Sequence, residues 1–80
     1  MKSIRLSKQA EKFLRKQDKI SFNRIMTAIY HLPNGNVKKL QGFDSIYRLR
    51  VGDFRVLYND KGEILDIIKI GNRGSVYNRL

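Results

Sequence analysis

The stretch YRLRVGDFRVLY, residues 47–58, reads as two strands joined by a two-residue turn. Gly52 stands first in that turn, and glycine adopts the positive φ angle that a tight hairpin turn requires. Pairing the strands across the turn places Val51 opposite Phe54, Leu49 opposite Val56 and Tyr47 opposite Tyr58, and these six residues share one apolar face. We therefore predict a β-hairpin with one face packed on a hydrophobic core.

The other face of this hairpin is basic. Arg50 falls opposite Arg55, and Arg48 lies two residues further along the first strand. Like charges placed directly opposite each other on a sheet are unfavourable. Folding alone gives no reason for this pairing, whereas a bound anion would. We interpret the face as an anion-binding surface; a solvated basic surface is the alternative that stays open.

Composition indicates which partners to expect. The chain of 80 residues has 17 Lys and Arg against 7 Asp and Glu, and its formal net charge is +10. A field of this sign attracts polyanions, so nucleic acid is the favoured partner and an acidic protein the next. No apolar run approaches the roughly 20 residues of a membrane span, and no signal-type segment begins the chain. We expect a single domain over residues 1–80, cytoplasmic and without a membrane partner.

The residue types that bind metals or act as nucleophiles are scarce. Cysteine is absent, His31 is the single histidine, and the acidic residues are scattered. A disulfide framework and a thiolate metal site are thereby excluded, and a protein-built metal cage or a Ser-His-Asp nucleophile is a poor prediction. We expect no metal and no cofactor.

The segments before the hairpin predict a short strand and two helices. Residues 2–6 alternate as a strand, and Ser7 suits the N-cap of a helix that ends near Asp18. A second helix begins at about Lys19 or Ser21 and is stopped by residues 33–36. Its apolar residues have helical spacing and form one stripe: Phe22, Ile25, Met26, Ile29 and Tyr30.

The remaining segments predict a loop and a last strand. Residues 37–45, which include Lys38 and Lys39, read as a basic loop leading into the hairpin. Residues 63–70 are almost continuously apolar, a pattern typical of a central strand covered on both faces. The order β-α-α-β-β-β predicts an α+β fold in which a two-helix hairpin covers one face of a small, twisted, mostly antiparallel sheet.

The C-terminal segment leaves the last strand through a glycine-rich turn. We expect it to bring Arg73 and Tyr77 back to the open side of the sheet, beside the hairpin arginines. Guanidinium groups bind phosphate bidentately, and a tyrosine ring stacks on an unpaired base. Tyr77 could equally cover the edge of the core, and both interpretations stay open.

Several motifs in this order and spacing resemble the RelE/ParE superfamily of toxins from toxin–antitoxin systems. The resemblance covers essentially the whole chain, and its motifs are residues 7–14, 47–50, 53–58, 70–73 and 76–77. For RelE-like members it implies metal-independent cleavage of mRNA in the ribosomal A site, which inhibits translation. It also implies an acidic antitoxin that wraps the toxin in a hetero-oligomer.

Carried over residue by residue, the resemblance implies a set of site residues. The catalytic positions of the family fall on Arg48, Arg50, Arg55, Arg73 and Tyr77. We add as RNA-binding residues the neighbouring polar side chains Lys38, Lys39, Lys69 and Asn72.

RNA cleavage without a metal explains why such a set is needed. The ribose 2′-hydroxyl attacks the neighbouring phosphorus, so a base must take its proton, cations must stabilise the phosphorane, and the departing 5′ oxygen needs help. Arginines supply the electrostatic part but are not deprotonated, and Arg48 and Arg50 replace the lysines that some RelE-type enzymes carry. We expect nearby guanidinium groups to lower the pKa of Tyr77, so that it acts as base, orients the 2′-hydroxyl or stacks on a base.

Two rival functions stay open. One is inhibition of DNA gyrase by binding, as in ParE-like toxins, without RNA chemistry. The other is a non-catalytic module on the same fold that binds RNA or the ribosome.

Overall fold

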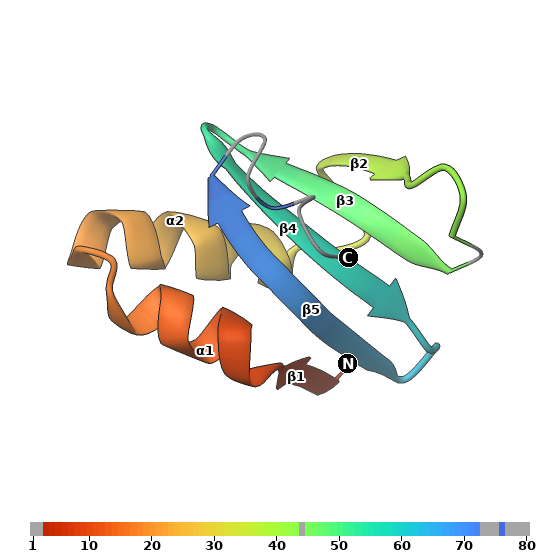
Figure 1. Cartoon of the computed structure of the whole chain (residues 1–80), viewed down its shortest axis with the longest axis horizontal. Coiled ribbons are helices and arrows are strands. Elements are labelled where there is room, and N and C mark those ends of the chain that lie inside the picture. Colours follow the sequence, from red (N-terminus) through yellow and green to blue (C-terminus); the bar gives the residue numbers. More distant parts are fainter. Residues whose placement is uncertain (1–2, 44, 73–75, 77–80) are drawn as a thin grey trace.

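A computed structural model describes residues 3–43, 45–72 and 76. Two helices lie on one side of a five-stranded sheet whose order is β1-β5-β4-β3-β2, so the predicted α+β class is confirmed (Figure 1). β1 runs parallel to β5, and all other neighbouring strands are antiparallel. The elements, in chain order, are β1 (Ser3–Leu6), α1 (Lys8–Arg15), α2 (Lys19–Tyr30), β2 (Asn36–Lys39), β3 (Ile46–Val51), β4 (Phe54–Asp60) and β5 (Ile64–Asn72).

The hairpin of β3 and β4 has the predicted register. Val51 pairs with Phe54, Leu49 with Val56, Tyr47 with Tyr58, and Arg50 with Arg55. Gly52 has a φ angle of 58°, the left-handed conformation that the turn requires. On the helix side the rings of Tyr47 and Tyr58 are stacked, with centroids 5.5 Å apart.

The prediction of a basic loop over residues 37–45 is partly wrong, because the segment contains most of the edge strand β2. β2 is antiparallel to β3, with Asn36 opposite Arg50 and Lys38 opposite Arg48. Only Val37 is apolar among its four residues, so the segment shows no alternation of its own. Its conformation is decided by the backbone hydrogen bonds that β3 offers.

β5 is an interior strand, although β4 holds the middle of the sheet. β5 pairs with β1 on one side and with β4 on the other. A register shift lies beside Leu57 and Tyr58, where Tyr58 pairs with Ile67 and Leu57 with Lys69, so Ile68 is an extra residue in β5. This bulge lets both Ile67 and Ile70 enter the core.

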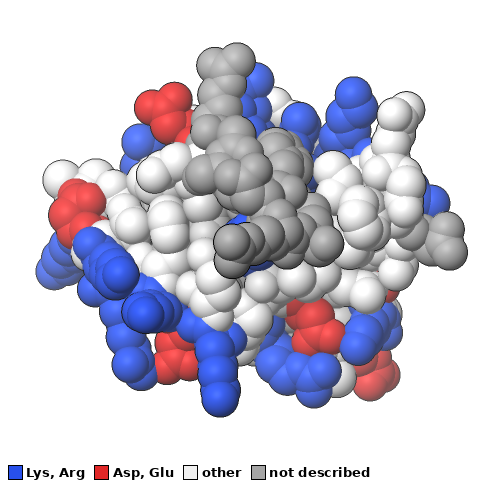
Figure 2. Space-filling view, viewed as in Figure 1, with Lys and Arg blue, Asp and Glu red and all other residues white. Residues whose placement is uncertain are grey.

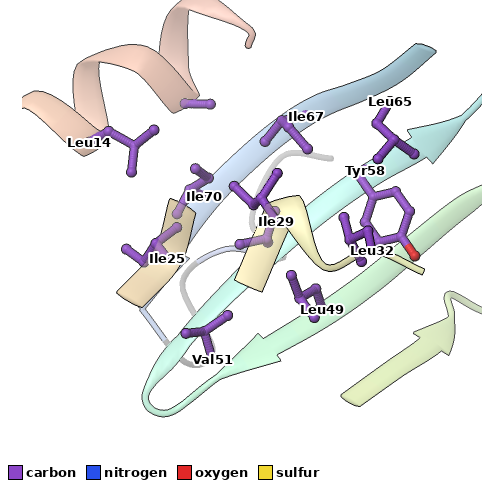
Figure 3. Close-up of a cluster of buried hydrophobic side chains, with 12 residues drawn as sticks. Leu14, Ile25, Ile29, Leu32, Leu49, Val51, Tyr58, Leu65, Ile67 and Ile70 are labelled. Atoms are coloured by element: carbon purple, nitrogen blue, oxygen red, sulfur yellow. The ribbon is translucent and has the colours of Figure 1, made fainter. Parts of the chain in front are cut away.

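The core lies between the helices and the sheet. Figure 3 shows side chains of α1 and α2 meeting those of β3, β4 and β5, with Ile25 and Ile29 central among them. The predicted stripe on α2 is only partly buried, because Phe22 and Tyr30 remain exposed. α2 contacts the sheet mainly through β3, and this narrow contact buries positions 25 and 29 but not the flanks of the stripe.

Side chains of α1 attach the helix to β5. Ser7 is the N-cap, as predicted: its Oγ accepts a hydrogen bond from the Ala10 amide at 3.1 Å and donates to the Ile68 carbonyl at 2.6 Å. The Gln9 amide group donates to the Ile70 carbonyl at 2.8 Å and accepts from the Ile70 amide at 2.9 Å. These contacts satisfy the backbone of β5 near its bulge. Within the described ranges, neither helix has the length and apolar character needed to cross a membrane.

Candidate nucleic-acid interface

Two rows of side chains cross the sheet on the face away from the helices. The strand registers place Lys38, Arg48, Leu57 and Lys69 in one row, and Asn36, Arg50, Arg55 and Gly71 in the next. Because side chains alternate along each strand, both rows lie on the same face. We call this surface the arginine face. Figure 2 shows basic side chains around the visible surface, with only small, separate acidic patches among them.

Arg50 and Arg55 differ in their surroundings, although they pair across the hairpin. Arg50 is exposed, whereas Arg55 is only 6% exposed. The Arg55 Nη1 atom donates to the carbonyls of Gly52 and Phe54, both at 2.9 Å. Arg55 therefore holds the hairpin turn, which is a folding role that sequence reasoning did not find. Arg50 makes no comparable hydrogen bonds to other described residues.

Arg48 is half-buried and oriented by a residue of the edge strand. Its Nη2 atom donates to Asn36 Oδ1 at 3.1 Å, while its Nε atom is buried without a hydrogen-bond partner among the described residues. A buried donor left unpaired costs free energy, and an anion oxygen would supply an acceptor. Asn36 was missed as a site residue, because its segment read as a loop.

Not all the residues predicted for the site meet on the arginine face. Lys38 and Lys69 are in the row of Arg48. Lys39 pairs with Tyr47 and Asn72 with Phe54, which places both in rows on the helix side of the sheet. Arg73 and Tyr77 lie outside the described residues.

Val76 belongs to the arginine face, although it comes from the C-terminal segment. It is fully buried, and a Cβ atom added to Gly71 would come within 3.2 Å of the Val76 Cβ. Gly71 is the register partner of Arg55, so Val76 packs beside the buried arginine. The immediate chain neighbour of Tyr77 is therefore anchored at this position.

Asp66 is an acidic residue on the same side of the sheet as the arginine face, one row beyond Arg48, because it pairs with Asn59 and Asn59 pairs with Ile46. Asp66 accepts hydrogen bonds from Lys61 Nζ at 2.9 Å and from Arg5 Nε at 2.8 Å. These two cations, Lys61 first, lower the pKa of Asp66. Among the described residues no carboxylate forms an ion pair with Arg48, Arg50 or Arg55. The same part of the chain contains no group of three or more potential metal ligands.

A protein-family model and several solved structures match this chain. The family model described as the ParE toxin of the type II toxin–antitoxin system parDE matches residues 4–77. No curated protein sequence matches the chain. Among solved structures, the RelE chain of an archaeal RelE–RelB complex from Pyrococcus horikoshii is 28% identical, with a TM-score of 0.70 over 91% of this chain and 96% of that one.

Two further structures have the same fold at lower identity. A chain of the RelB–RelE antitoxin–toxin complex of Methanococcus jannaschii is 24% identical, with a TM-score of 0.74, over 95% of this chain and 98% of that one. The isolated E. coli RelE toxin is 18% identical, with a TM-score of 0.75, over 90% of this chain and 84% of that one. With the family match covering residues 4–77, this chain belongs to the ParE toxin family of the RelE/ParE superfamily and is a toxin of a type II toxin–antitoxin system.

Proposed function

We propose that this toxin is a ribosome-dependent endoribonuclease that cleaves mRNA and so inhibits translation. The observation that carries the proposal is the exposed Arg50, held beside Arg48 on a sheet face where no described carboxylate pairs with either. The similarity to the Pyrococcus horikoshii RelE chain, at 28% identity, supports the RelE-like activity over the whole fold.

In the proposed reaction the protein supplies charge and position. The 2′ oxygen of a ribose attacks the adjacent phosphorus, a bond forms between them, and the bond to the 5′ oxygen breaks. Arg48 and Arg50 stabilise the negative charge of the phosphorane, and electrostatic stabilisation of this kind usually contributes most to the rate enhancement of an enzyme. Arg55 contributes by holding the turn, and Lys38 and Lys69 bind neighbouring phosphates.

The proton transfers need groups other than arginine. Arg48, Arg50 and Arg73 remain protonated, so they do not serve as base. We assign the 2′ proton to Tyr77, with Arg73 as a further cation. Proton delivery to the 5′ oxygen is assigned to the RNA or the ribosome. No metal and no cofactor take part.

An acidic antitoxin is the proposed protein partner. The Pyrococcus horikoshii and Methanococcus jannaschii structures are complexes of RelE with RelB. The net charge of +10 of the present chain favours an acidic partner of the same kind. Covering the arginine face would block RNA and keep the toxin inactive.

Primer extension on a translated message tests the proposal. Wild-type protein should produce new 5′ ends, and Arg50→Ala or Arg73→Ala should reduce the cleavage rate by about 10²- to 10³-fold. Arg15→Ala is the matched control, because Arg15 is an exposed arginine on α1, where it pairs with Glu11. Cleavage by Arg50→Ala at the wild-type rate would overturn the assignment of this residue.

The second candidate is inhibition of DNA gyrase by binding, the activity that the resemblance gives for ParE-like toxins, and the family model that matches this chain is that of the ParE toxin. In cells that express the toxin, gyrase inhibition predicts a different result from mRNA cleavage. Messages would stay intact at growth arrest while gyrase-dependent DNA breaks appear. That combination would refute the ribonuclease proposal.

A further inference from the structure

The connection between β2 and β3 contains a hollow that lies apart from the arginine face. Its volume is about 410 Å³, and it is lined by Lys39, Leu40, Gln41, Gly42 and Phe43. Volumes of this order are typical of sites for small organic groups. The lining combines an aromatic ring, a side-chain amide and a cation, which suits a flat ligand with polar edges and a nearby negative charge.

Phe43 is the feature of this hollow that points to a ligand. Its side chain is among the large apolar ones left exposed, at 39%. The ring contacts among the described residues join Phe13 to Phe54 and Tyr47 to Tyr58, and none involves Phe43. An exposed aromatic ring binds an unpaired nucleic-acid base by stacking, without regard to base identity. The exposed Gln41 amide both donates and accepts hydrogen bonds, as the edge of a base requires.

Cations of the arginine face lead toward the end of β3 at which the hollow lies. Arg50, Arg48 and Ile46 follow one another at alternate positions of β3, and Lys38 lies opposite Arg48. The Cα atoms of Arg50 and Ile46 are about 13 Å apart at the usual rise of a strand. Figure 1 shows the β2–β3 connection at the opposite end of β3 from the Gly52 turn. A strand of RNA that starts at Arg50 and follows Arg48 and Lys38 therefore runs toward this end of β3, and it reaches the hollow by passing the edge strand β2 to Lys39, which lies on the helix side.

We propose that this hollow binds an unpaired base of single-stranded RNA, one that flanks the nucleotides held on the arginine face. Phe43 stacks on the base, Gln41 bonds to its edge, and Lys38 and Lys39 contact the adjoining phosphates. The inference rests on the proposed function, since it takes RNA as the ligand. It adds a binding site at the end of β2 that would let the protein respond to a base away from the cleaved bond.

The chain contains no tryptophan, which permits a direct test by fluorescence. Phe43→Trp places a single fluorophore in the hollow, and a stacked base should quench its emission. The probe is a single-stranded RNA of about ten nucleotides with 2′-O-methyl ribose, whose blocked 2′ oxygen prevents cleavage. Phe22→Trp is the matched control, because Phe22 is also 39% exposed but lies on α2, in the helix layer.

We expect quenching of Phe43→Trp and none of Phe22→Trp at the same saturating RNA concentration. Phe43→Ala should weaken binding of this RNA by about 5- to 150-fold, the range found when a stacking residue is truncated. Phe43→Tyr and Phe22→Ala should bind as wild type does. Unquenched Phe43→Trp at saturation, or wild-type affinity of Phe43→Ala, would overturn the proposal.

The outcomes separate this inference from the proposed function. Binding is measured on RNA that is not cleaved, so intact messages in the primer-extension experiment would not by themselves affect this result. If Phe43→Ala binds the RNA normally but loses affinity for the acidic antitoxin, the hollow belongs to a protein interface and the inference is wrong.

Discussion

Arg50 and Arg55 show how two equal charges on one hairpin acquire different roles. The guanidinium of Arg55 is buried and satisfies two carbonyls of the turn, whereas that of Arg50 faces solvent. Hydrogen bonds from a charged donor compensate part of the cost of burial. The unfavourable pairing is thus partly offset by the turn itself, and Arg50 is the member that is available to a ligand.

Replacing each arginine by alanine should separate these roles. We expect Arg55→Ala to lower the free energy of unfolding by about 2–3 kcal/mol, because two carbonyls lose their donor and a buried volume is emptied. Arg50→Ala should change it by less than about 0.5 kcal/mol, as is usual for exposed positions. Urea denaturation measures both values. Equal destabilisation by the two substitutions would contradict the structural role of Arg55.

Tyr58 makes stability depend on alkaline pH. Burial, with the Asp60 carboxylate as the next cause, raises the pKa of Tyr58 to about 12. In the unfolded chain a tyrosine ionises near pH 10, so the unfolded state binds fewer protons above that pH. The stabilisation from neutral Tyr58 is complete below about pH 10 and is lost as the pH rises toward about 12.

The absorbance of tyrosinate checks this expectation. One tyrosine should ionise only near pH 12 in the folded protein, and Tyr58→Phe should remove that ionisation step. The free energy of unfolding of Tyr58→Phe should also decrease less steeply above pH 10. Tyr30→Phe, at an exposed position of α2, is the control and should leave the step in place. Ionisation of every tyrosine near pH 10 without unfolding would show that Tyr58 is not shielded.

Much of the arginine face could be predicted from the sequence, because it follows from alternation about one glycine turn. Arg48, Arg50 and Arg55 lie on one face as expected. Lys39 and Asn72 do not, because each is one residue out of phase with that face. Asn36 could not be found, since its contact with Arg48 exists only when β2 is paired with β3.

At the level of elements, the predictions succeeded where a segment carries its own signal. The hairpin has a turn glycine and clear alternation, and α1 has its cap at Ser7. β2 has neither feature, so its strand conformation depends on its neighbour. In β5 the continuous apolar run was interpreted as burial on both faces, but the extra residue Ile68 accounts for part of that run.

A side chain at Gly71 is expected to crowd Val76, although the backbone of Gly71 does not require glycine. A Cβ there would lie 3.2 Å from the Val76 Cβ and 3.3 Å from the Val76 Cα. We expect Gly71→Ala to lower the free energy of unfolding by about 1–3 kcal/mol, the usual cost of overpacking. In a chain shortened to residue 75, the same substitution should cost much less. Thermal denaturation of the four proteins measures this difference, and an equal cost in both backgrounds would exclude Val76 as the cause.

On the scale of the whole molecule, the net charge of +10 should make RNA binding depend steeply on salt. Each phosphate contact that is lost reduces the slope of log K against log salt concentration by about 0.7 for a single strand. Lys38→Ala should produce a change of this size, because Lys38 adjoins Arg48 on the arginine face. Lys12→Ala, on α1, should leave the slope unchanged. Binding of 2′-O-methyl RNA at several salt concentrations measures the slopes, and equal slopes for wild type and Lys38→Ala would place the RNA elsewhere.

The hydrogen bonds of Arg5, Ser7 and Gln9 to β5 each join residues 61 positions apart. Contacts of such separation form late, because a long loop must close before they stabilise the fold. During synthesis, β1 and α1 leave the ribosome first, and they lack their contacts with β5 until β5 has emerged after the hairpin. Until β5 has been made, the sheet that supports the arginines is incomplete. Under the proposed function, we therefore expect a nascent chain to be harmless to the ribosome that is making it, because the arginine face is assembled only after β5 has emerged.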